Sequence, residues 1–174
     1  MKHESDKIQE IEIEDISLNF DEVYTKEYIP TEHLGDIKKA NVLLLPNENF
    51  KGNKGYFFPE CTEEVYQYLK ENENDNVNFD ICSSDEDYKE IELHADVINI
   101  PLIIAQWVVI PTLTSMLASY LYDKIKNTFS NSKDVNTNIN IIVEKKGKSK
   151  MIKYEGSIEN FEQAMKNINE TIFK

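Results

Sequence analysis

The hydrophobic pattern of this chain is dominated by a charge-free run from Val97 to Tyr122, which lies in an otherwise strongly acidic sequence. A membrane-spanning helix needs about 20 predominantly apolar residues, so the run is long enough to cross a bilayer. Pro101 and Pro111 divide it, however, and each proline removes a backbone donor and restrains the residue before it. These interruptions favour the buried centre of a globular domain over one continuous membrane helix.

The part of the run after Pro111 is amphipathic, whereas a helix in lipid would carry apolar side chains on every side. We therefore expect three pieces: a strand that ends near residue 99, a deeply buried helix or strand over residues 102–110, and a helix over residues 112–127. A membrane-associated segment over residues 98–122 is the alternative. The apolar stripe of the expected helix consists of Leu113, Met116, Leu117, Tyr120, Leu121 and Ile125.

Alternating or unbroken apolar positions predict strands in four other places. Residues 11–20 nearly alternate, with a phase slip at Glu14-Asp15 that suggests a bulge. Residues 41–45 form an unbroken apolar run, which is typical of a strand buried on both faces. Residues 77–82 alternate, and residues 90–97 alternate cleanly between acidic or histidine side chains and apolar ones.

Helical spacing and turn residues complete the pattern. Residues 62–71 read as a short helix. Two strands near residues 139–143 and 151–154 are joined by a turn at 146–148, which predicts a hairpin. The following residues, from Ser157 to Ile172, place their apolar side chains on one helical stripe.

These elements predict an α/β or α+β fold with a single domain. We expect a mixed β-sheet packed against the central apolar helix, with a ββα element at the C-terminus. The expected organisation is a frayed polar tail over residues 1–8, an α/β core over 9–127, a connector over 128–138 and the ββα element over 139–174. At 174 residues, 40% of them hydrophobic, the chain is long enough to bury a substantial core.

The charge of the chain restricts its partners. Its formal net charge is −13, and residues 1–122 alone carry 25 acidic residues against 9 lysines. Such a surface repels nucleic-acid backbones and anionic lipids. All 19 basic residues are lysines, so the chain lacks the planar arginine fork that most often recognises phosphate and guanine. Nucleic acid is therefore a disfavoured partner, and a membrane is less favoured than a protein.

The two cysteines, Cys61 and Cys82, match neither a disulfide framework nor a zinc motif. The first residues, MKHESDKIQE, lack the apolar stretch of a signal peptide. A reducing, bacterial-type cytoplasm is the expected location.

The loop over residues 47–59 is the first place to look for a site, because it follows a buried strand and precedes a helix. It matches neither a phosphate-binding loop nor a dinucleotide fingerprint. Its lysines could contact an anion, and its aromatic residues either anchor the loop on the core or contact a partner. The candidate contact residues are Lys51, Lys54, Tyr56, Phe57 and Phe58.

Other constellations are weaker. Cys82, His94 and Asp80 supply the residue types of a nucleophile, a base and an orienting group, but no oxyanion-hole motif accompanies them. The face of the strand over residues 90–96 gathers Glu90, Glu92, His94 and Asp96, for which a solvated surface is favoured over a metal site. No catalytic residue, metal ligand or cofactor is assigned.

The pattern favours a non-catalytic interaction protein, an accessory or regulatory subunit that binds a protein partner or itself. Two features support that expectation. One is the aromatic-rich loop, and the other is the uneven charge of the chain, since residues 123–174 carry 10 lysines against 7 acidic residues whereas residues 1–122 are strongly acidic. The alternatives are a membrane-associated protein that uses residues 98–122 and a small enzyme with its site in the 47–59 loop.

Overall fold

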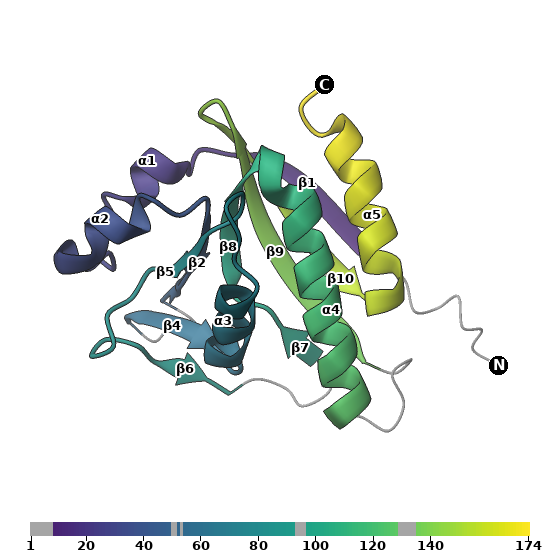
Figure 1. Cartoon of the computed structure of the whole chain (residues 1–174), viewed down its shortest axis with the longest axis horizontal. Helices are drawn as coiled ribbons and strands as arrows, with labels where there is room; N and C mark the ends of the chain where they lie inside the picture. Colours follow the sequence, from purple (N-terminus) through teal and green to yellow (C-terminus); the bar gives the residue numbers. More distant parts are fainter. Residues whose placement is uncertain (1–8, 50–51, 53, 93–96, 129–134) are drawn as a thin grey trace.

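The computed structural model describes residues 9–49, 52, 54–92, 97–128 and 135–174. It is a mixed α+β fold, as the sequence predicts, built around one seven-stranded sheet (Figure 1). The order across the sheet is β1-β10-β9-β8-β2-β5, and β7 also pairs with β9. The strands are β1 (Glu10–Ile16), β2 (Val42–Leu45), β5 (Phe79–Ile81), β7 (Val97–Asn99), β8 (Leu102–Gln106), β9 (Asn136–Lys145) and β10 (Lys148–Gly156).

Three helices cover one face of this sheet: α3 (Thr62–Glu71), α4 (Ile110–Thr128) and α5 (Ile158–Thr171) (Figure 1). The main core lies between them and the sheet. Alternate residues of the central strands point to the opposite face, where α1 (Phe20–Val23) and α2 (Leu34–Ile37) bury a second, smaller core. The strand β2 is buried on both faces, as its unbroken apolar run predicts.

The run from Val97 to Tyr122 divides into three pieces at its two prolines. Strands β7 and β8 follow the same neighbour, β9, and are separated by Ile100 and Pro101. A short 3-10 turn, Trp107–Val109, leads into α4, whose second residue is Pro111. The middle piece, which the sequence left open between helix and strand, is therefore mostly a strand. Among the described residues, no helix has both the length and the apolar character that crossing a bilayer requires.

The C-terminal ββα element is an integral part of the sheet. Strand β9 lies between β10 and β8, so the hairpin contributes central strands. Its two-residue turn is Lys146-Gly147, and both residues have positive φ, +52° and +81°, as a type I′ turn requires. The expected stripe of α5 is buried against the sheet. Of the expected connector, Thr128 ends α4, the residues from Asn136 belong to β9, and 129–134 lie outside the described residues.

Several sequence expectations need correction. The strand expected over 11–20 ends at Ile16, because Asn19 caps a helix that begins at Phe20. The expected loop 47–59 contains two strands, β3 (Asn47–Glu48) and β4 (Tyr56–Pro59), which form a second sheet with β6 (Glu90–Ile91). The strand expected over 90–97 has its two ends in different sheets, since β6 pairs with β4 and β7 pairs with β9.

Candidate functional site

The aromatic side chains of the predicted 47–59 site anchor the small sheet. Phe58 is only 2% exposed, and its ring stacks on that of Tyr88 with centroids 5.1 Å apart. The hydroxyl of Tyr56 donates to the Glu27 carboxylate at 3.1 Å, and its ring meets the edge of Tyr28 at 5.3 Å. These contacts account for the aromatic content of the loop by packing.

The remaining candidates of that loop lie toward solvent or outside the described residues. Phe57 is half-buried and Lys54 is exposed, whereas Lys51 lies outside the described residues. An anion or partner contact at these residues stays a prediction.

The cysteine candidate is poorly prepared for nucleophilic chemistry. The Cys82 side chain is 0% exposed, and burial, reinforced by the charge of Asp80, raises the pKa of its thiol far above the usual value. Asp80 instead accepts a hydrogen bond from the Tyr66 hydroxyl at 3.3 Å. The expected base, His94, lies outside the described residues.

The metal candidates on the strand over residues 90–96 are likewise incomplete. Glu90 accepts hydrogen bonds from the Tyr88 hydroxyl at 2.5 Å and from the Glu63 N–H at 3.2 Å, while His94 and Asp96 lie outside the described residues. Within the described part of the chain, no three His, Cys, Asp or Glu side chains are grouped so that they could hold a metal ion.

The two edges of the main sheet differ in how their backbone groups are satisfied. At the β5 edge, the N–H of Val42 bonds to the carbonyl of Asn78, and the N–H of Cys82 bonds to the carbonyl of Leu44. The backbone groups of Asp80 and of the two flanking residues, Asn78 and Cys82, therefore face β2. Those of Phe79 and Ile81 point away from the sheet. Such outward groups are a template for another strand unless something covers them.

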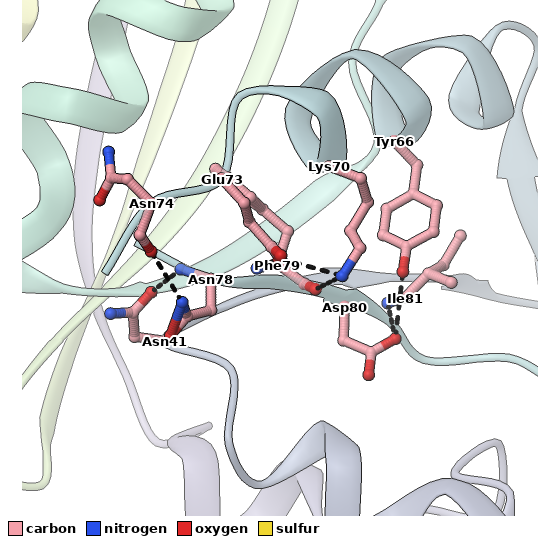
Figure 2. A network of polar contacts seen from close by, with 9 residues as sticks. All are labelled: Asn41, Tyr66, Lys70, Glu73, Asn74, Asn78, Phe79, Asp80 and Ile81. Atoms are coloured by element: carbon pink, nitrogen blue, oxygen red, sulfur yellow. Dashed lines mark hydrogen bonds and ion pairs between the residues drawn. The ribbon is translucent and has the colours of Figure 1, made fainter. Parts of the chain in front are cut away.

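Side chains cover three of the four outward groups of β5, the N–H and C=O of Phe79 and the N–H of Ile81 (Figure 2). The Glu73 carboxylate accepts from the Phe79 N–H at 2.8 Å, and the Lys70 ammonium donates to the Phe79 carbonyl at 3.3 Å. Glu73 and Lys70 also pair with each other at 3.0 Å. The Asp80 carboxylate accepts from the Ile81 N–H at 2.8 Å. We call this arrangement the covered edge.

Electrostatics within the covered edge favour the charged form of Glu73. Partial burial on its own would raise the pKa of this carboxyl. The Phe79 N–H and the Lys70 ammonium together outweigh that effect and hold the pKa below its usual value.

At the β1 edge, the outward groups have no partner among the described residues. The two-residue turn makes Lys145 and Lys148 a hydrogen-bonded pair. Every second residue of β10, starting from Lys148, therefore bonds to β9. The alternate residues of β10, starting from Ser149, bond to β1. The β1 residues that receive those bonds are Glu10, Glu12, Glu14 and Ile16. The N–H and C=O groups that point away from the sheet belong to Ile11, Ile13 and Asp15.

No described backbone or side-chain group bonds to these outward groups. We call the outward backbone groups of Ile11, Ile13 and Asp15 the open edge. The strand that carries it, β1, has seven residues and is about 23 Å long.

The side chains of β1 are divided between two faces. Ile11 and Ile13 are 38% and 45% exposed, although their cross-strand partners Tyr154 and Ile152 are buried in the main core. Each isoleucine therefore presents apolar surface beside the core at the limit of the sheet.

The glutamates of β1 occupy its other face, whereas Asp15 shares the face of Ile11 and Ile13. These glutamates are Glu10, Glu12 and Glu14, and Glu10 and Glu12 line a cavity of about 780 Å³ together with Lys153 and Glu155. Lys153 pairs with Glu14 at 3.0 Å. Within the described chain, no lysine lies within ion-pair distance of Glu10 or Glu12, and Glu10 stands directly opposite Glu155. Among the described residues, the first half of β1 therefore carries more negative than positive charge, because the lysine opposite Glu12, Lys153, pairs with Glu14.

Sequence reasoning identified β1 as a strand but not as an edge. The signal was present in the alternation Glu-Ile-Glu-Ile-Glu, which puts charge on one face and apolar surface on the other. An edge position depends on which strands pair, and the local pattern does not specify pairing over 140 residues of separation.

Comparisons with protein-family models, curated proteins and solved structures found no match. The function is therefore argued from the residues of this chain.

Proposed function

We propose that this chain is a non-catalytic interaction protein that binds a protein partner by adding a strand of that partner to β1. The single observation that carries the proposal is the contrast between the covered edge at β5 and the open edge at β1. Natural sheets manage their edges, because an unpaired strand pairs with other chains. Because side chains cover the β5 edge, and the outward groups of β1 have no partner among the described residues, a strand of another protein can add to this sheet at β1.

The composition of β1 suits strand addition. Three residues offer six outward backbone groups, which give affinity when an extended peptide pairs with them. Ile11 and Ile13 offer apolar area on one face for the alternate side chains of that peptide. We also propose that the interaction takes place in a reducing cytoplasm, which the free thiols of Cys61 and Cys82 support.

Replacement of Ile13 by proline tests the proposal. Proline has no N–H, and the N–H of Ile13 points away from β10, so the substitution blocks the open edge without removing a bond of the sheet. The matched control is Ile13→Val, which keeps both the N–H and a β-branched side chain. Circular dichroism and thermal unfolding establish that both variants fold.

The assay is affinity capture from extracts of the native host, followed by titration calorimetry with each purified captured protein. We expect a protein that binds the wild type and Ile13→Val directly and binds Ile13→Pro at least tenfold more weakly. Equal affinity for all three forms, or no protein that binds the purified wild type, would show that β1 is not the interaction site.

A further inference from the structure

The charge on β1 restricts what can pair with it. Glu10, Glu12 and Glu14 project from one face of the strand, and only Glu14 has a lysine partner among the described residues. The adjoining cavity adds Glu155 and contains one lysine, Lys153, which is already engaged by Glu14. A strand added to the open edge would therefore place every second side chain beside Glu10 and Glu12, which have no ion-pair partner among the described residues.

A second copy of this chain is a poor occupant. An added β1 strand must use the same outward residues, so odd-numbered positions pair with odd-numbered ones in every antiparallel register. Glutamates then stand opposite glutamates, for example Glu12 opposite Glu14 of the other copy. Like charges directly across two strands destabilise the pair. The acidic face thus disfavours self-pairing through β1.

A cationic strand has the complementary pattern. Lysine or arginine at every second position would lie beside Glu10 and Glu12 on the acidic face. Aliphatic residues at the intervening positions would lie beside Ile11 and Ile13 on the other face. Strand β10 already pairs lysines with β1 on its inner side: Lys153 pairs with Glu14 at 3.0 Å on the acidic face, and Lys150 pairs with Asp15 at 3.1 Å on the face of Ile11 and Ile13.

We propose that the partner segment recognised by β1 is an extended basic peptide in which lysine or arginine alternates with aliphatic residues. This inference rests on the proposed function and specifies its partner. The backbone groups of the open edge supply the pairing, and the acidic face selects the charge of the added strand.

The test uses three synthetic nine-residue peptides and the full chain. The first alternates lysine with valine, the second contains the same residues in separate blocks, and the third alternates glutamate with valine. Fluorescence anisotropy at about 0.15 M salt reports affinity under conditions where general attraction to an acidic protein is screened. We expect the alternating lysine peptide to bind at least tenfold more tightly than either of the others.

Amide hydrogen exchange, measured by NMR, identifies the site of binding. The amides of Ile11, Ile13 and Asp15 should exchange more slowly in the presence of the lysine–valine peptide, since they gain partners. The amides of Glu12 and Glu14 already bond to β10 and should change little. Protection confined to another part of the chain would overturn the proposal.

Charge reversal at Glu10 and Glu12 tests the selection of sign. The double variant Glu10→Lys/Glu12→Lys should bind the lysine–valine peptide at least tenfold more weakly and should gain affinity for the glutamate–valine peptide. The matched control is Glu32→Lys/Glu60→Lys, which changes the net charge equally at exposed positions away from β1 and should bind as the wild type does.

The possible outcomes separate this inference from the proposed function. Equal binding of the alternating and blocked peptides would show general electrostatic attraction only, and equal binding of both alternating peptides would show that charge does not select the strand. Either result overturns the basic-peptide proposal, while a partner that is lost on Ile13→Pro would still support the function. Concentration-dependent protection of Ile11 and Ile13 without any peptide would identify a second copy as the occupant.

Discussion

Removal of the Glu73 charge tests how the covered edge contributes to stability. Its carboxylate is 28% exposed and makes two charge-assisted contacts, with the Phe79 N–H at 2.8 Å and with the Lys70 ammonium at 3.0 Å. Glutamine has the same shape and can still accept from the Phe79 N–H, but it lacks the charge. Glu73→Gln therefore isolates the electrostatic part of the contact.

The magnitude follows from the two contacts. A hydrogen bond to a charged group contributes about 1.5–3 kcal/mol and a neutral one about 0.5–1.5 kcal/mol. A partly exposed ion pair adds about 0.2–1 kcal/mol. We expect Glu73→Gln to lower the free energy of unfolding by about 1–2 kcal/mol at pH 7. Glu73→Ala, which also deprives the Phe79 N–H of its acceptor, should cost about 2–3 kcal/mol.

The effect should depend on pH with a defined sign. The pKa of Glu73 is lower in the folded protein than in the unfolded chain, so the carboxylate stabilises the fold at pH values above the pKa of the unfolded chain. The contribution is lost as the pH falls through the folded-state pKa, because the carboxyl is then protonated in both states. The difference between wild type and Glu73→Gln should therefore shrink toward zero in acid.

Urea unfolding followed by circular dichroism at a series of pH values measures this difference. Glu71→Gln is the matched control, since Glu71 is an exposed glutamate two residues before Glu73, at the end of α3. A Glu73→Gln variant that is as stable as Glu71→Gln at pH 7, or a difference that does not change with pH, would refute the electrostatic account of the covered edge.

Three further substitutions test other parts of the fold by the same unfolding assay. Leu117→Ala removes a fully buried side chain of α4 and should cost about 2–5 kcal/mol, whereas a loss below about 1 kcal/mol would show that this helix is not central to the core. Glu144→Gln should raise stability at pH 7, because burial raises the pKa of this carboxyl and makes its charged form unfavourable; the gain should vanish at low pH, where Glu144 is protonated. Gly147→Ala should cost about 1 kcal/mol, since φ is +81° there, and an unchanged midpoint would argue against the type I′ turn.

The treatment of the two sheet edges has a physical consequence beyond this chain's own stability. On the covered edge, the charged side chains of Lys70 and Glu73 form hydrogen bonds with backbone groups of the same molecule. On the open edge, the charges of β1 lie on the face of the strand and leave its outward backbone groups accessible among the described residues. Acidic side chains there discourage self-association but do not prevent pairing with a cationic strand.

Local patterns predicted the elements whose burial is set by their own spacing. Helix α4 follows from the apolar stripe after Pro111, because one residue in every three or four recurs on the same side of a helix. The hairpin of β9 and β10 follows from the turn at Gly147 and the alternation on either side of it. Strand β2 follows from an unbroken apolar run that only a strand covered on both faces can bury.

Elements that depend on distant partners were harder to predict. Strands β3 and β4 were expected to be a loop, since their pairing with each other and with β6 joins short segments without a long periodic pattern. The strand expected over residues 90–97 has ends in two sheets for the same reason.

Three features follow from the amino-acid sequence without reference to the fold: the fold class, the buried centre at the two prolines and the C-terminal ββα element. In each of these, hydrophobic periodicity and backbone stereochemistry act within about 20 residues. The three-dimensional arrangement of the strands was needed to establish that β1 pairs with β10, some 140 residues away, and therefore that β1 lies at an edge. The same arrangement places Lys70 and Glu73 over the outward backbone groups of β5. It leaves those of Ile11 and Ile13 in β1 without a partner among the described residues. Those differences arise from the pairing order of the strands, which local patterns do not encode.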